Sequence, residues 1–172
     1  MEFFDVVKAR YSCRQFDSSK PVEDEKLEKI LEAGILAPTA KNAQPVKIWV
    51  LKSEEALAKI RSVMPFKWAD TPVVLVVGGT KEGAFVRPSD NRNFGDVDAS
   101  IVATHLMLAV ENVGLGSTWV GFFDVPKTKE LFPEMKDYDL VAIFPIGYPA
   151  SDAQPSERHP LRKAKAEMVK YL

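Results

Sequence analysis

Residues 98–113 have the sequence DASIVATHLMLAVENV, which forms the strongest helical pattern in the chain. Apolar side chains cover much of the circumference of this helix, so we expect it to lie buried at the centre of the molecule. Asp98 is placed to cap the first turn, because an aspartate oxygen can accept hydrogen bonds from the free amides there. Gly114 follows the last turn, where a glycine readily ends a helix.

Shorter helices and strands alternate irregularly around this stretch. Helical spacing of apolar residues predicts helices at about 2–9, 22–37, 53–63 and 126–131. Apolar runs predict strands at about 46–51, 71–78, 117–123 and 140–147. This order predicts an α+β fold with a sheet sandwiched by helices and one long central helix. Residues 80–96 are polar and contain glycine and proline, and a loop of this length is often functional.

The composition excludes several classes of protein. A chain of 172 residues can form a single domain with a sizeable core. Its 23 basic and 24 acidic side chains argue against nucleic acid as a partner, since phosphate backbones select strongly basic surfaces. One cysteine, Cys13, excludes internal disulfides, and no histidine spacing supports a metal site. With no long apolar run and no signal-like start, we expect a cytoplasmic protein without a membrane partner.

The last part of the chain, residues 149–172, is polar and basic until it closes on the apolar sequence MVKYL at 168–172. Such a tail is too open to close the core of a monomer. We therefore expect its apolar end to dock on a second subunit.

A first candidate binding segment is residues 10–16, RYSCRQF. Arg10 and Arg14 place two guanidinium groups near the hydroxyl of Ser12, and arginine forms paired hydrogen bonds with phosphate. Arg158, in an isolated SERHP sequence, is a further candidate for the same anion. A solvated basic turn would give the same pattern, and the sequence does not show whether these arginines converge.

A second candidate segment is residues 37–45, APTAKNAQP. The amide side chains of Asn42 and Gln44 can pair with the edge of a polar heterocycle. Room for a flat ring is left by the residues before them, Pro38, Thr39 and Ala40. An ordinary helix-ending turn is the alternative. Together with an anion site, the segment indicates a bound phosphorylated heterocycle.

Other signals are weaker. Gly121 would let the backbone approach a ligand, although a glycine is also tolerated in a strand or bulge. The sequence GGTKEG at 78–83 lacks both the dinucleotide fingerprint and the ending of a phosphate loop. Cys13 is more typical of a small packed residue than of a nucleophile, and His105 is typical of a core histidine. His159 is placed beside the candidate anion site.

In their order along the chain, these segments resemble the nitroreductase family of FMN-dependent oxidoreductases. Residues 10–16 are similar to the R-x-S-x-R-x-F motif of that family, and residues 37–45 resemble its A-P-[ST]-x-x-N-x-Q-P loop. Residues 98–121 resemble its D-x(n)-L-A-A-x-x-x-G-L-G-x-x-W-I-G stretch. The closing I-G-Y-P and R-x-P-L elements match residues 146–149 and 158–161. The resemblance spans nearly the whole chain.

This resemblance implies a nitroreductase-like, mainly antiparallel sheet and an intertwined homodimer. Residues 1–172 would form one FMN-binding domain, with the tail 149–172 on the partner subunit. In the shared site, the FMN phosphate and ribityl chain would be held by Arg10, Ser12 and Arg158. Arg14 would lie near flavin N1 and O2, and Tyr11 belongs to the same binding segment. The ring would be contacted from the other subunit by Pro38, Thr39, Ala40 and Asn42, and backbone amides near N5 would come from Val120 and Gly121.

The resemblance also implies an activity. NADH or NADPH would give hydride to flavin N5, and a nitroaromatic, quinone or similar acceptor would then take it in a ping-pong reaction, with no side chain acting as a general base. The chain departs from the family pattern at Val46, where an aromatic residue is common, and at Val110. The alternatives are a dehalogenating or flavin-consuming relative of the same fold and a non-enzymatic flavin-binding module.

Overall fold

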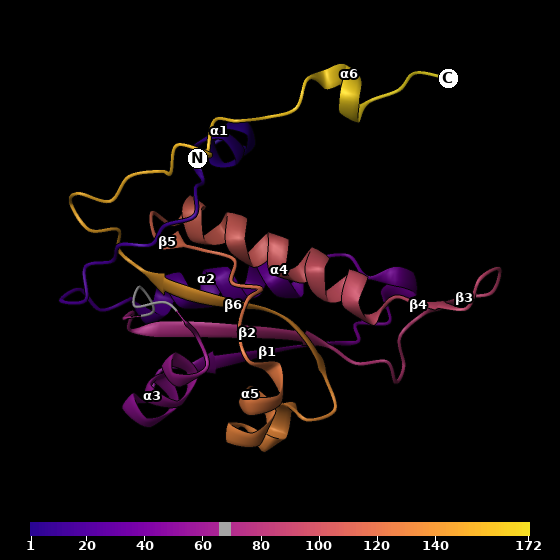
Figure 1. The fold of residues 1–172 in the computed structure, drawn as a ribbon, viewed down its shortest axis with the longest axis horizontal. Coiled ribbons are helices and arrows are strands. Elements are labelled where there is room, and N and C mark those ends of the chain that lie inside the picture. The colour runs from indigo at the N-terminus through magenta and orange to yellow at the C-terminus, as the bar shows by residue number, and fades with distance from the viewer. Residues whose placement is uncertain (66–69) are drawn as a thin grey trace.

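The computed structural model describes residues 1–65 and 70–172, which form an α+β fold around an antiparallel sheet (Figure 1). The described strands pair in the order β1 (Val46–Leu51), β2 (Val73–Gly79), β6 (Asp139–Gly147) and β5 (Gly116–Ser117). Every pair in this sheet is antiparallel. The helices are α1 (Phe3–Ala9), α2 (Asp24–Ile35), α3 (Glu54–Ser62), α4 (Gly95–Asn112), α5 (Val125–Leu131) and α6 (Lys165–Met168), with 3-10 turns η1 (Ala40–Asn42) and η3 (Pro133–Met135).

Both faces of the sheet are covered, α2 and α4 lying on one and α3 and α5 on the other (Figure 1). The central strand β2 is buried along its whole length, and its side chains alternate between two cores. Val73, Leu75 and Val77 belong to the core that includes residues of α2 and α4. Val74 and Val76 belong to the core that includes residues of α3. The predicted sandwich is therefore confirmed.

The central helix α4 is longer than the sequence indicates, because it begins at Gly95 rather than at Ala99. The prediction that Asp98 caps the helix is wrong. Phe94 occupies the N-cap position without a side-chain cap, and the residue before it, Asn93, accepts a hydrogen bond from the Gly95 amide on its Oδ1 at 2.9 Å. Asp98 lies inside the first turn and is buried. The predicted end is confirmed, because Gly114 has the left-handed φ of 77° after the last turn.

The predicted strand at 117–123 is wrong in its extent. Only Gly116 and Ser117 form the strand β5, although Val120 rejoins β6 through an isolated bridge to Ile143. This bridge keeps the register that pairs Ser117 with Ile146. In between, Trp119 packs edge-on against Phe144 with ring centroids 5.3 Å apart. Apolar alternation predicts an extended chain, but it does not predict how many residues remain hydrogen-bonded to the neighbouring strand.

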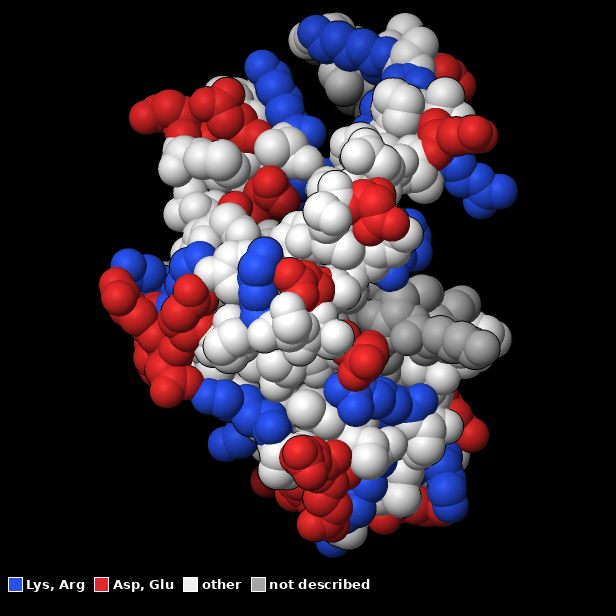
Figure 2. Space-filling model, turned by 90° about the vertical axis from the view of Figure 1, so that its left-hand side faces the viewer, with Lys and Arg blue, Asp and Glu red and all other residues white. Residues whose placement is uncertain are grey.

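Residues 80–96 contain a short hairpin of β3 (Val86–Arg87) and β4 (Arg92–Asn93), which projects beyond one end of α4 (Figure 1). The tail after β6 runs away from the sheet and ends in the exposed side chains of Met168, Tyr171 and Leu172. Figure 2 shows acidic and basic side chains interspersed over one face of the molecule. Among the described residues, no helix has the length and apolar character needed to cross a bilayer.

Candidate functional site

A cavity of about 260 Å³ brings the predicted arginines together. The first candidate segment contributes Arg10, Ser12 and Arg14, and the tail contributes Arg158. Three further tail residues line the same cavity, namely Ser156, His159 and Arg162. Four guanidinium groups therefore surround one hollow, and none of its described lining residues is acidic. Such a donor set fits a phosphate group.

The extended backbone after α1 explains how one short segment supplies three of these side chains. Ser12 forms a parallel bridge with Ser117, and the Cys13 amide donates to the Ser117 carbonyl at 2.9 Å. In an extended chain, alternate side chains share a face, so residues 10, 12 and 14 can face the cavity together. Cys13 points the other way and is fully buried. The prediction that Cys13 is a packed small residue is confirmed.

The cavity also depends on the start of the tail. The Ala150 amide donates to the Gln15 carbonyl at 3.0 Å, and the Asp17 amide donates to the Tyr148 carbonyl at 2.9 Å. These bonds tie the tail's first residues to the first candidate segment. The sequence predicted Arg158 as a candidate but missed Arg162. A basic tail without periodic apolar residues gives no signal of which cations face inward.

Tyr11 lies next to His159, one of the residues that line the cavity. Its ring lies edge-on to that of His159, with centroids 6.4 Å apart. Burial is the main cause that raises the pKa of Tyr11 to about 12, and the nearby Cys13 adds to the shift. The phenol is therefore neutral at physiological pH. Burial also raises the pKa of Glu111, which lies close enough to Arg10 for that charge to oppose the shift.

The second candidate segment is a loop with unusual backbone geometry. Lys41, Asn42 and Gln44 have φ values of 53°, 53° and 52°, in the left-handed region that side chains other than glycine rarely adopt. Two hydrogen bonds close the loop on itself. The backbone amide of Gln44 donates to Thr39 Oγ1 at 3.0 Å, and the Gln44 side chain donates from Nε2 to Asn42 Oδ1 at 3.0 Å. The Ala40 amide donates to Asp98 Oδ1 at 2.9 Å.

The two candidate segments lie at opposite ends of α4. The loop is anchored at Asp98 in the first turn, whereas Arg10 lies near Glu111 in the last turn. At 1.5 Å per residue, these two helix positions are roughly 20 Å apart. Within one chain, the structure therefore does not bring Pro38, Thr39, Ala40 or Asn42 to the arginine cavity.

The backbone near residue 120 is partly hydrogen-bonded to the sheet. The Val120 amide donates to the Ile143 carbonyl at 2.9 Å, so it is already paired. Gly121 is exposed, and the nearest atom to a Cβ built on it is Trp119 Nε1 at 3.9 Å. Of the two predicted positions, only Gly121 is exposed, so only its backbone is open to a ligand.

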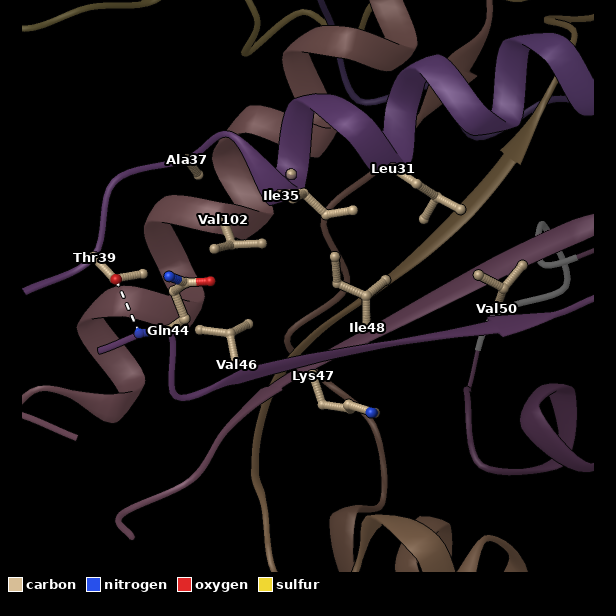
Figure 3. A pocket seen from close by; sticks show the side chains of 11 residues that line it. Leu31, Ile35, Ala37, Thr39, Gln44, Val46, Lys47, Ile48, Val50 and Val102 are labelled. Atoms are coloured by element: carbon tan, nitrogen blue, oxygen red, sulfur yellow. Dashed lines mark hydrogen bonds between the residues drawn. The ribbon is translucent and has the colours of Figure 1, made fainter. Parts of the chain in front are cut away.

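A second hollow of about 370 Å³ lies between α2, β1 and α4 (Figure 3). We call this the α2–β1 groove. Its lining is mainly apolar and includes Leu31, Ile35, Ile48 and Val50, with the bonded pair Thr39 and Gln44 at one end (Figure 3). β1 is an edge strand of the described sheet. The groove therefore presents apolar side chains beside an unpaired strand edge.

The family model for the nitroreductase family matches residues 7–65 and 65–148. The chain belongs to the nitroreductase family. A nitroreductase family protein from Clostridium difficile is 34% identical, with a TM-score of 0.90 over 99% of this chain and 98% of the other. An NADH dehydrogenase of Thermus thermophilus is 26% identical over 90% of both chains. A protein of Exiguobacterium sibiricum, solved in complex with FMN, has the same fold at 21% identity and a TM-score of 0.85, covering 100% and 98% of the two chains.

Proposed function

We propose that this nitroreductase family member is an FMN-dependent oxidoreductase. It would take hydride from NADH or NADPH and pass it, in ping-pong fashion, to a nitroaromatic, a quinone or a similar small acceptor. The arginine cavity carries this proposal, because four guanidinium groups and two serines suit the phosphate of FMN. The FMN complex of the Exiguobacterium protein and the activity named for the Thermus relative support the choice of cofactor and reductant.

Five of the cavity residues have a specific role in this proposal. Arg10, Ser12 and Arg158 would bind the phosphate and ribityl chain, and Arg162 would add a further positive charge. Arg14 would lie toward the pyrimidine side of the ring, where a cation stabilises negative charge that develops on reduction. Tyr11 would support the site indirectly, through the contact of its ring with His159. Bound FMN would supply the hydride chemistry at N5, near the open backbone of Gly121.

A second subunit would complete the site. The loop carrying Pro38, Thr39, Ala40 and Asn42 lies at the far end of α4 from the cavity, so it would contact the ring bound by the partner. The exposed apolar end of the tail, from Met168 to Leu172, would cover the partner's α2–β1 groove and strand edge. Residues 1–172 would thus act as one FMN-binding domain within a homodimer.

Flavin spectroscopy tests this function. The purified protein should be yellow, and its flavin absorbance should bleach when NADH or NADPH is added without oxygen. Colourless protein that cannot be reconstituted with FMN would contradict the proposal. Bound FMN that neither nicotinamide reduces would indicate a binding module instead. A turnover screen of nitroaromatics, quinones and halogenated phenols would separate a general reductase from a dehalogenating relative.

A further inference from the structure

Asp98 is a buried carboxylate whose two oxygens have different surroundings. Its exposed fraction is 1%. Oδ1 accepts the Ala40 amide at 2.9 Å, whereas Oδ2 is buried without a hydrogen-bond partner among the described residues. The first turn of α4 provides a favourable place for this charge, because helix N-termini stabilise anions. A buried oxygen without a hydrogen bond still lowers the stability of the fold. Proteins retain such groups mainly at functional sites.

The loop that Asp98 holds is itself in a costly conformation. Lys41 and Asn42, directly after the anchored Ala40, have left-handed φ values, and so does Gln44 two residues further on. A strained backbone of this kind persists only when its surroundings restrain it. A second restraint comes from the same end of α4. Lys41 Nζ lies 4.9 Å from the centroid of the Phe85 ring, which packs against Phe94 just before the helix.

We propose that Asp98 is a positioning residue that holds the loop from Thr39 to Gln44 in the shape that receives the flavin ring. This inference rests on the proposed function, in which Thr39, Ala40 and Asn42 contact the ring. By fixing the Ala40 amide, the carboxylate prepares the left-handed turn before the ligand arrives. The free energy of ordering the loop is then not subtracted from the free energy of flavin binding.

Two readouts test this role in protein stripped of FMN. Amide hydrogen exchange measures how firmly residues 39–44 are held, and titration with FMN measures the dissociation constant. In Asp98→Ala, we expect exchange in the loop to accelerate at least tenfold and the dissociation constant for FMN to rise at least tenfold. Asp98→Asn keeps an oxygen that can accept from the Ala40 amide, so it should fall between wild type and alanine. It also carries the test if the alanine variant fails to fold.

Asp96→Ala is the matched control. Asp96 lies in the same first turn, but it is exposed and faces Arg92 at 3.6 Å. This variant should leave both readouts at wild-type values. Unchanged loop exchange in the Asp98 variants would overturn the proposal, as would faster exchange with an unchanged dissociation constant. A wild-type protein that binds no FMN would refute the proposed function instead, and loop exchange would still show whether Asp98 restrains the loop.

Discussion

The backbone amide of Cys13 donates a hydrogen bond to the carbonyl oxygen of Ser117 at 2.9 Å. This bond holds the first candidate segment extended against β5, which directs Arg10, Ser12 and Arg14 toward one cavity. The neighbouring Gly116 makes the approach possible. A Cβ built on Gly116 would lie 2.9 Å from both Cβ and Sγ of Cys13, closer than these atoms can pack.

Gly116→Ala should therefore displace the segment at Cys13. We expect a loss of about 1–3 kcal/mol in the free energy of unfolding, typical of overpacking, together with weaker FMN binding. Urea denaturation and FMN titration measure the two effects. Gly121→Ala is the control for stability, because the space around it is open. Equal stability of Gly116→Ala and wild type would show that the segment can move without cost.

Arg10→Ala should weaken FMN binding while leaving the fold intact. Losing one hydrogen bond to a charged group corresponds to an increase in the dissociation constant of about tenfold to a hundredfold. Arg162→Ala should act in the same direction, because Arg162 lines the same cavity. Lys8→Ala removes an equal charge from an exposed position on α1 and should have little effect. Unchanged FMN affinity in Arg10→Ala would contradict the role assigned to that residue.

Tyr11 should make stability fall at alkaline pH. Its folded-state pKa of about 12 lies above the ordinary tyrosine value of 10.0, so the unfolded chain loses the phenolic proton first. As pH rises between these values, the unfolded state is favoured and the contribution to stability is lost. Tyr11→Phe removes the ionisation. Its free energy of unfolding should decline less steeply than that of wild type between pH 10 and 12, and identical slopes would refute the assignment.

Removal of residues 168–172 should weaken the proposed dimer and, because the proposed site is shared between subunits, FMN binding. The apolar side chains removed are exposed in the single chain, so folding of the subunit should be little affected. Light scattering over a concentration series measures the association. Lys170→Ala, which keeps the apolar side chains, is the control. A truncated protein that remains a fully loaded dimer would exclude tail docking.

Ile35→Asp tests the α2–β1 groove from the other side. Ile35 lines the groove and is 74% exposed, so a charge there should disturb an occupant more than the subunit's own core. The dimer dissociation constant should rise at least tenfold. Lys29→Ala changes the net charge by the same amount on an exposed part of α2 and should leave association unchanged. Matching values for the two variants would show that nothing docks in the groove.

The α+β class, the sandwich and the central helix were all predictable from the amino-acid sequence. Each follows from local periodicity, which reports which side chains need burial. The sequence also predicted Arg10, Arg14 and Arg158 as candidates, because arginine beside a hydroxyl has a recognisable chemistry. The extent of β5 and the start of α4 were not predictable in this way. The extent of β5 depends on which distant residues stay paired, as Val120 does with Ile143. The start of α4 depends on the hydrogen bond from the Gly95 amide to Asn93 Oδ1, which periodicity does not report.

The grouping of the candidate residues follows from contacts between distant parts of the chain. Arg158 and Arg162 join Arg10 because the chain after β6 pairs with Gln15 and Asp17, more than a hundred residues earlier. Asp98 changes from a predicted cap to the anchor of a distant loop for the same reason. Local sequence specifies the charge and shape of each side chain. Long-range pairing and the length of α4 determine which side chains meet, and they separate the two candidate segments within one chain.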